Sequence, residues 1–224
     1  CEEAKELGIK RVIIPKANAN EVSIIKGINI IPVITLNEVI KYLNKEIFIE
    51  KEAERKVDFI KEYSMDFADI KGQENVKRAL EVASAGGHNV LMVGSPGSGK
   101  TALAKRILTI LPDLTLEEAI ETTKIHSVSA NLTREGLILS RPFRMPHHTA
   151  PIKSIIGGGK NPTPGEVSLA HNGILFFDEL TEYNRTVLEA LREPLEEKEI
   201  TINRLSGNYI YPCNFMFVAS MNPC

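Results

Sequence analysis

One eight-residue segment of the chain has the residue types needed to bind phosphate. It matches the pattern G-x-x-x-x-G-K-[ST], known as the P-loop, and consists of Gly94, Ser95, Pro96, Gly97, Ser98, Gly99, Lys100 and Thr101. Glycines let the backbone approach an anion closely, and the following helix adds the positive end of its dipole. In such a loop Lys100 can reach the β- and γ-phosphates of ATP, and the Thr101 hydroxyl can hold Mg²⁺.

The segments on either side of this loop follow in the order that the motif requires. Residues 89–93 form a short, mostly apolar run that predicts a buried strand. Residues 102–108 carry apolar side chains at helical spacing. A glycine-rich turn that matched by chance would lack these flanks, so the sequence predicts a nucleotide-binding strand, loop and helix.

A second candidate element is the apolar run 174–179, which ends in Asp178 and Glu179. A continuous apolar run suits a central parallel strand, whose carboxyl end is where open α/β sheets bind ligands. Asp178 is then expected beside Thr101, where it binds Mg²⁺ directly or through water. Glu179 is expected to orient and deprotonate the attacking water. The alternative is an ordinary helix cap that follows a strand.

A third element is the strand-like run 215–220, which Asn222 follows closely. A polar side chain at that strand end could contact the γ-phosphate or the attacking water. Asparagine is also a common turn residue before a proline, here Pro223. The pattern by itself leaves both interpretations open.

The composition is that of an ordinary globular protein. Apolar residues make up 43% and charged residues 25% of the 224 residues, and the net charge of −2 gives no overall basic character. A local basic groove for nucleic acid stays possible, because it would not show in this sum. No run is long enough to span a bilayer, no secretory signal opens the chain, and three cysteines give no disulfide framework. We therefore expect a cytoplasmic protein without membrane partners, and the start at Cys1 indicates a piece of a longer one.

The chain divides into three parts by composition. Residues 1–44 alternate helix-like and strand-like segments, with one helix expected at 21–26. Eleven of the eighteen residues from 45 to 62 are charged, which predicts a linker over 45–65. The second domain, 66–224, contains a proline- and glycine-rich stretch at 126–165 that we expect to be irregular. A hairpin signal follows around Ser206-Gly207-Asn208.

The sequence leaves the roles of two groups of side chains open. Four histidines, His126, His147, His148 and His171, have no cysteine or carboxylate at metal-ligand spacing, so hydrogen bonding is favoured over zinc binding. Four basic residues could face phosphate or DNA, or could be solvated or contact another subunit: Arg141, Arg144, Lys153 and Lys160.

Taken together, several segments resemble the magnesium chelatase-like AAA+ ATPases of the YifB/ComM group. They are Gly72-Gln73, Ala85-Gly86-Gly87-His88-Asn89, the P-loop, Ile125-His126-Ser127, Arg141-Pro142-Phe143-Arg144, Pro146-His147-His148-Thr149, Gly157-Gly158-Gly159, the run 164–173, the acid-ended strand, Leu191-Arg192-Glu193-Pro194-Leu195-Glu196 and Met221-Asn222-Pro223-Cys224. The resemblance covers residues 66–224. Residues 1–44 are similar to the end of the Lon-protease-like domain that precedes the ATPase in that group.

The resemblance implies more than the motifs do. It implies an α/β fold, with a parallel sheet flanked by helices, and self-assembly into a ring, usually a hexamer, with ATP at the subunit interfaces. It makes Asn222 the sensor of the γ-phosphate, and the segment 69–73 a contact for adenine. It also implies a DNA motor, because ComM proteins are helicases that drive branch migration in natural transformation. A chelatase-type ATPase subunit and an ATP-dependent regulatory or scaffold module are the alternatives.

Overall fold

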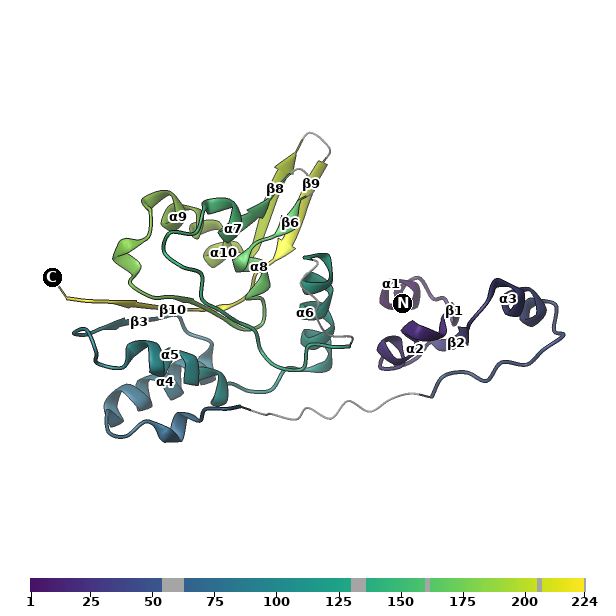
Figure 1. The fold of residues 1–224 in the computed structure, drawn as a ribbon, viewed down its shortest axis with the longest axis horizontal. Coiled ribbons are helices and arrows are strands. Elements are labelled where there is room, and N and C mark those ends of the chain that lie inside the picture. Colours follow the sequence, from purple (N-terminus) through teal and green to yellow (C-terminus); the bar gives the residue numbers. More distant parts are fainter. Residues whose placement is uncertain (54–62, 130–135, 160–161, 205–206, 224) are drawn as a thin grey trace. The chain divides into compact units, whose positions relative to one another are not determined.

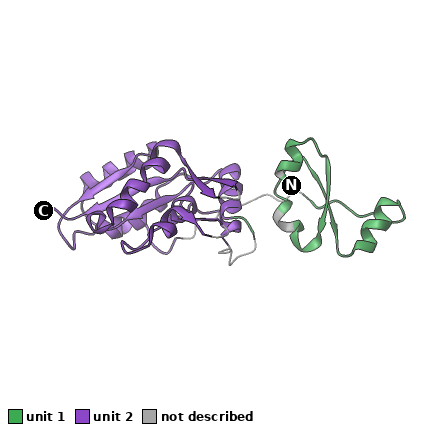
Figure 2. Ribbon diagram, turned by 90° about the horizontal axis from the view of Figure 1, so that it is seen from above, with its two compact units in different colours: residues 1–59, 134–137 green, residues 60–133, 138–224 purple. Residues whose placement is uncertain are grey.

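The computed structural model describes residues 1–53, 63–129, 136–159, 162–204 and 207–223. The chain forms two compact units, residues 1–59 with 134–137 and residues 60–133 with 138–224 (Figure 2). Part of the predicted linker, residues 54–62, lies outside the described residues, as do Lys160 and Ser206. Each unit is described by itself.

The first unit is a small α/β arrangement. Its two strands are parallel, β1 (Arg11–Pro15) and β2 (Asn29–Val33), and its helices are α1 (Glu2–Glu6), α2 (Lys16–Val22) and α3 (Leu36–Leu43). The helix predicted at 21–26 is wrong, because α2 starts directly after β1. Pro15, with φ of −57°, ends the strand and precedes the helix, and the small side chain of Ala19 is buried against the sheet core. The assignment of residues 1–44 to a Lon-protease-like domain stays a prediction.

The second unit is built on a four-stranded parallel sheet (Figure 1). In spatial order the strands are β3 (Val90–Val93), β10 (Met216–Met221), β7 (Ile174–Phe177) and β4 (Phe143–Arg144). All three pairings between neighbours are parallel. The sheet confirms the predicted P-loop α/β fold.

Helices cover both faces of this sheet (Figure 1). One face packs against α4 (Glu74–Gly86) and α5 (Lys100–Arg106), and the other against α7 (Ile152–Ile156), α8 (Glu166–Leu169), α9 (Arg185–Ala190) and α10 (Arg192–Glu197). On β7, Phe176 belongs to the first core and Phe177 to the second, because neighbouring side chains of a strand point to opposite faces. A strand buried on both faces must be apolar throughout, which explains the uninterrupted run that ends at Asp178.

The stretch 126–165 contains more regular structure than we expected. Helix α6 (Leu116–Val128) begins at a capping box of Thr115 and Glu118, and β4 and α7 follow it, then the short antiparallel pair β5 (Gly157–Gly158) and β6 (Thr163–Pro164). Gly157 has a φ of +95°, and a Cβ there would lie 2.6 Å from the carbonyl oxygen of Thr163. Only glycine fits this crossing, so close backbone packing explains the first glycine of the run.

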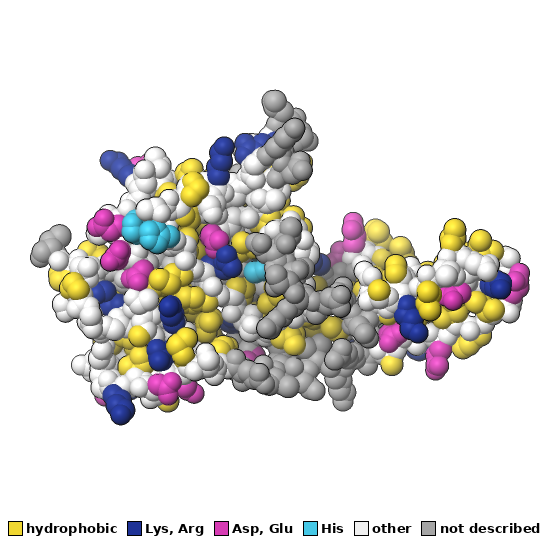
Figure 3. All heavy atoms as spheres, in the orientation of Figure 1, with side chains coloured by type: hydrophobic (Ala, Val, Ile, Leu, Met, Phe, Trp, Pro, Cys, Tyr) yellow, Lys and Arg dark blue, Asp and Glu magenta, His cyan; other side chains and the backbone are white. Residues whose placement is uncertain are grey.

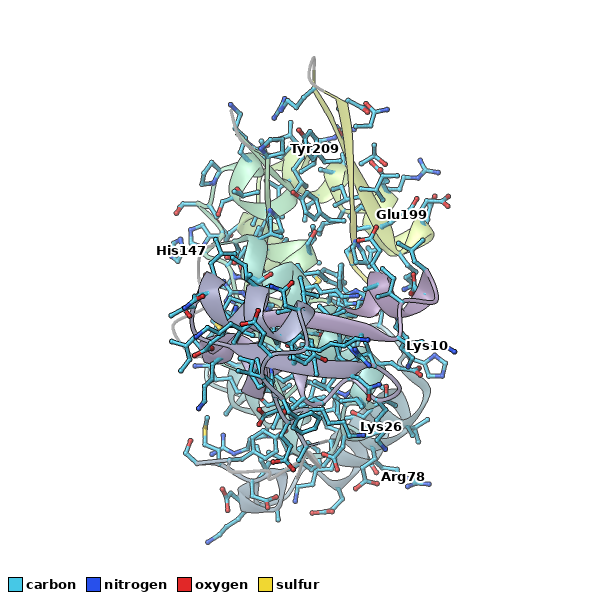
Figure 4. All side chains as sticks on the ribbon, turned by 90° about the vertical axis from the view of Figure 1, so that its right-hand side faces the viewer. Lys10, Lys26, Arg78, His147, Glu199 and Tyr209 are labelled. Atoms are coloured by element: carbon cyan, nitrogen blue, oxygen red, sulfur yellow. The ribbon has the colours of Figure 1, made fainter. Side chains whose placement is uncertain are left out.

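The predicted hairpin is present as β8 (Glu199–Arg204) and β9 (Gly207–Pro212), which pair in antiparallel fashion. Figure 4 shows Glu199 and Tyr209 at different heights along it. Ile200 and Ile202 of β8 are buried, and the Tyr211 hydroxyl donates to the carbonyl oxygen of Pro162 at 2.9 Å. In the part of the chain that the structure describes, no helix has both the length and the apolar character of a membrane span.

Because of His126, we expect the second unit to be less stable in mild acid. Its Nε2 lies 3.0 Å from the carbonyl oxygen of Leu169, near the end of α6. Burial lowers the pKa of the imidazole from its ordinary 6.5; Leu169 and Glu166 oppose this shift, and Arg144 adds to it. The unfolded chain therefore takes up a proton at a higher pH than the folded chain does. The free energy of unfolding then falls as the pH drops below about 6.5.

Urea unfolding at about pH 7.5 and about pH 5.5 measures this dependence on either side of the ordinary histidine pKa. His126→Gln keeps an N–H donor for Leu169 but cannot titrate, so its stability should fall less on acidification than that of the wild type. Equal losses in the two proteins would contradict the role of His126.

Candidate nucleotide-binding site

The P-loop connects β3 to α5 at the carboxyl edge of the sheet. Gly97 and Gly99 have φ values of +78° and +87°, a backbone conformation that side chains with a Cβ rarely adopt. Gly99 directly precedes α5, and the side chain of Gln73 donates from Nε2 to the carbonyl oxygen of Ser98 at 3.0 Å. The left-handed glycines and this contact fix the loop in its bend around the start of the helix.

Lys100 ties the P-loop to the end of the neighbouring strand. Its Nζ donates to the carbonyl oxygens of Gly94 at 2.7 Å and Ser95 at 3.0 Å. The same atom donates to Oδ1 of Asn222 at 3.0 Å, although 122 residues separate the two in sequence. The structure therefore places Asn222 at the ammonium group of the P-loop lysine, which the sequence pattern alone had left open.

Thr101 and Asp178 meet directly at the same edge. The Thr101 hydroxyl donates to Oδ2 of Asp178 at 2.7 Å. Two adjacent oxygen ligands of an octahedral Mg²⁺, with bonds of about 2.1 Å, lie about 3 Å apart. A hydroxyl and a carboxylate at this separation fit such an ion with little movement, and nucleotide phosphates and water usually complete its shell.

Glu179, the second acid, has an unusual backbone. Its φ and ψ are +55° and +54°, the left-handed region that non-glycine residues seldom occupy, and its side chain is exposed. Its backbone N–H donates to the hydroxyl of Ser220 on β10 at 3.3 Å. Backbone strain of this kind is tolerated only where the surroundings hold it, and it is concentrated at functional sites.

A cavity of about 420 Å³ lies beside the P-loop. Its wall is mostly apolar, with a few polar groups, and is formed by Gln73, Asn75, Val76, Ala79, Leu80, Val90, Leu91, Met92, Val93, Gly94, Ser98, Lys100 and Leu103. Gln73 thus contacts the loop and lines the cavity at once. An apolar wall with a few polar groups is typical of sites for small molecules and cofactors.

A buried tyrosine supports the loop that follows β4. Tyr183 stacks on Phe177 with ring centroids 4.0 Å apart, and its hydroxyl donates to the carbonyl oxygen of Pro146 at 2.6 Å. Burial, with a smaller effect of the Asp178 charge, raises the pKa of Tyr183 to about 12. The phenol is therefore neutral at physiological pH and can donate this hydrogen bond.

Two of the four candidate basic residues have structural partners, which the sequence did not reveal. Arg144 pairs with Glu166 through two hydrogen bonds of 2.6 and 2.8 Å, and this pairing raises the pKa of the arginine. Arg141 donates to the carbonyl oxygens of Pro112, Asn172 and Asp113 and to a Glu118 oxygen. Both arginines thus have partners within the fold, whereas Lys153 is exposed, and a role of the basic residues toward DNA stays a prediction.

The histidines make ordinary polar contacts. His147 and His148 lie with ring centroids 4.2 Å apart, and His147 hydrogen-bonds Thr149; Figure 4 shows His147 at the outer surface. Figure 3 shows His side chains gathered beside acidic ones on the second unit. His171 accepts the N–H of Asn214 at 3.0 Å. Among the described residues, no group of three or more His, Cys, Asp or Glu is arranged to hold a metal ion.

The sequence reasoning missed one residue of the site, Ser220. It is 1% exposed, and its hydroxyl contacts both Asp178 and the backbone of Glu179. The available signal was its position at the end of the predicted strand 215–220, at the same edge as Asn222.

Comparison with known proteins gives consistent relatives. The family model for magnesium chelatase, subunit ChlI, matches residues 66–224. The competence protein ComM of Haemophilus influenzae is 45% identical over 218 residues, which cover 96% of this chain and 43% of that protein. The uncharacterized protein YifB of Escherichia coli is 43% identical over 215 residues, which cover 96% and 42%. The chain thus spans less than half the length of these curated relatives.

A solved structure shares the fold. It describes the complex between subunits BchI and BchD of magnesium chelatase, and it matches with a TM-score of 0.57 and 22% identity. The match covers 70% of this chain and 55% of that one. At this identity, the likeness supports the fold alone.

Proposed function

Because the chain belongs to the magnesium chelatase subunit ChlI family, with ComM and YifB among its relatives, we propose that it is the ATP-binding part of a ring-forming AAA+ motor that remodels DNA. One observation carries the ATPase part of this proposal. Three adjacent strands bring the P-loop, the acids Asp178 and Glu179, and Asn222 to one edge of the sheet, where Lys100 contacts Asn222 and Thr101 contacts Asp178.

In the proposed reaction each group of this edge has one task. The P-loop backbone and Lys100 bind the phosphates of ATP, and the lysine charge offsets negative charge that develops on the γ-phosphate. Thr101 and Asp178 hold Mg²⁺, which when bound neutralises charge on the phosphate oxygens. The cavity beside Gln73 receives the adenine ring.

Glu179 and Asn222 act on the attacking water and the γ-phosphate. Glu179 lies exposed at the end of β7, where its carboxylate can accept a proton from water. Asn222 contacts Lys100 through its amide oxygen, so a phosphate that draws the lysine away frees the amide to contact the phosphate. Asn222 would thereby report whether the γ-phosphate is present.

The DNA part of the proposal rests on the relatives. The similarity to ComM extends over 96% of the chain, including the residues before the ATPase unit, which favours a ComM-like role in competence or recombination. A chelatase-type ATPase subunit is the second candidate, because the family model bears that description. Assembly into a homo-oligomeric ring, expected to be a hexamer, belongs to both candidates.

We predict that forked DNA raises ATP hydrolysis by the full-length protein several-fold. A motor that moves on DNA couples each turnover to its track, so the track accelerates turnover. The measurement is phosphate release with and without forked DNA, with Glu179→Gln as the control for hydrolysis at this site. ATP hydrolysis that ignores DNA but responds to a porphyrin-binding partner subunit would contradict the DNA role and support the chelatase alternative.

A further inference from the structure

Ser220 occupies the point where the two acids of the site meet the middle strand. Its side chain is 1% exposed, and it lies on β10 between β3 and β7. Its hydroxyl donates to Oδ1 of Asp178 and accepts the backbone N–H of Glu179 at 3.3 Å. One oxygen atom therefore contacts both residues that follow β7.

The first contact, with Oδ1, determines which oxygen of Asp178 is available to the Thr101 hydroxyl and the proposed Mg²⁺ site. The final side-chain torsion of an aspartate is soft, so the carboxylate turns easily unless both its oxygens have partners. Here Ser220 binds Oδ1 and Thr101 binds Oδ2. With Oδ1 held by Ser220, the carboxylate presents Oδ2 to the Thr101 hydroxyl, where the proposed Mg²⁺ site lies.

The second contact holds the unusual backbone of Glu179. The direction of its N–H is set by the peptide that joins Asp178 to Glu179, and Glu179 itself has a φ of +55°. A hydrogen bond to this N–H restrains the peptide against relaxing into an ordinary conformation. The exposed side chain of Glu179 thus starts from a backbone that Ser220 keeps in place.

The same strand also reaches the P-loop. Asn222 lies two residues beyond Ser220, just past the end of β10 at Met221, and contacts Lys100. The end of β10 and the residue that follows it therefore contact both the P-loop and the acids. Asn222 contacts the phosphate-binding lysine, and Ser220 contacts the Asp178 carboxylate and the backbone of Glu179. We propose that Ser220 is a positioning residue that orients Asp178 toward the metal and fixes the backbone of Glu179, a role that rests on the ATPase function proposed above.

The role is tested by how strongly Mg²⁺ increases nucleotide affinity in the full-length protein. The probe is AMP-PNP, whose β–γ bridge resists hydrolysis, titrated by calorimetry in Mg²⁺ and in EDTA. For Ser220→Ala we expect the increase of affinity due to Mg²⁺ to shrink about tenfold, because one hydrogen bond to a charged group is lost. Affinity in EDTA should stay within about twofold of the wild type, because the P-loop contacts with phosphate are intact.

Two further variants show how the increase of affinity due to Mg²⁺ responds to a complete loss and to an unrelated change. Asp178→Asn should remove nearly all of the increase due to Mg²⁺. Ser84→Ala should change neither affinity, because the Ser84 hydroxyl is also buried but belongs to α4 and has no hydrogen-bond partner in the described part of the chain. If Ser220→Ala does not fold, Ser220→Cys keeps nearly the same volume with a weaker donor and should give a smaller loss in the same direction.

The outcomes separate this inference from the proposed function. A wild-type protein that does not bind AMP-PNP, or binds it no better in Mg²⁺, overturns the ATPase proposal and the role of Ser220 with it. If Mg²⁺ clearly increases the affinity of the wild type for AMP-PNP, and a Ser220→Ala or Ser220→Cys variant keeps all of this increase, the positioning role alone is overturned. Thermal unfolding of each variant shows whether a loss of stability accompanies the change.

Discussion

Replacing Lys100 with alanine is expected to weaken ATP binding on the order of 10²-fold or more, since charge-assisted contacts to phosphate are among the strongest in a site of this kind. In the structure Lys100 Nζ already faces the loop, bound to the carbonyl oxygens of Gly94 and Ser95 and to Asn222. Alanine would leave the anion opposite backbone N–H groups alone. The measurement is the dissociation constant of ATP by calorimetry.

The matched control for this experiment is Lys105→Ala. Lys105 is an exposed residue in the last turn of the same helix, away from the loop. Its loss should therefore leave the affinity for ATP almost unchanged. Circular dichroism of both variants checks that the sheet is folded. A Lys100→Ala protein that binds ATP as tightly as the wild type would contradict the P-loop assignment.

Glu179→Gln is expected to keep ATP binding and to lower turnover on the order of 10²-fold or more, as loss of a general base does. Glutamine has almost the same shape but cannot accept the proton of water. The φ of +55° at Glu179 concerns the backbone and not the side chain, so the substitution should leave it unchanged. Steady-state hydrolysis gives kcat, and calorimetry gives the affinity.

Glu182→Gln is the companion variant, because Glu182 is an exposed acid three residues further on. Its kcat should match that of the wild type. Equal turnover in Glu179→Gln and the wild type would remove Glu179 from the reaction, whereas a joint loss of binding and turnover would point to a folding defect at the end of β7.

The parts of the fold that the sequence predicts well are those set by local pattern. The P-loop, its flanking strand and helix, and the capping box at Thr115 each depend on residues within a few positions of one another. The fully apolar run before Asp178 also indicates its own burial on both faces. Because parallel strands end at one edge, these strands also predicted that Asp178 lies beside Thr101, whereas the pattern left the contact of Asn222 open.

The parts that escaped prediction depend on distant contacts. Ser220 contacts residues 41 and 42 positions away, and its place near the end of a strand does not reveal these partners. Arg144 suggested an exposed charge until the fold placed Glu166, 22 residues away, against it. Helix α2, with the sequence KANANEV, shows no clear helical spacing of large apolar residues, and its place depends on the burial of Ala19 in the core. Residue roles in catalysis remain predictions.

The position of β10 in the sheet has a consequence for synthesis of the chain. β10 lies between β3 and β7, yet it is made last of the four strands. At about 5–20 residues per second, the roughly 120 residues between Val93 and Met216 take on the order of 6–25 s to translate. β3 lacks its β10 partner for this whole time, and β7 lacks it from its own synthesis at Ile174–Phe177 onward. Each strand then presents an unpaired edge, the kind of edge through which nascent chains associate wrongly. Once β10 has been made, its pairing with β3 and β7 therefore completes the sheet and the nucleotide site in one step.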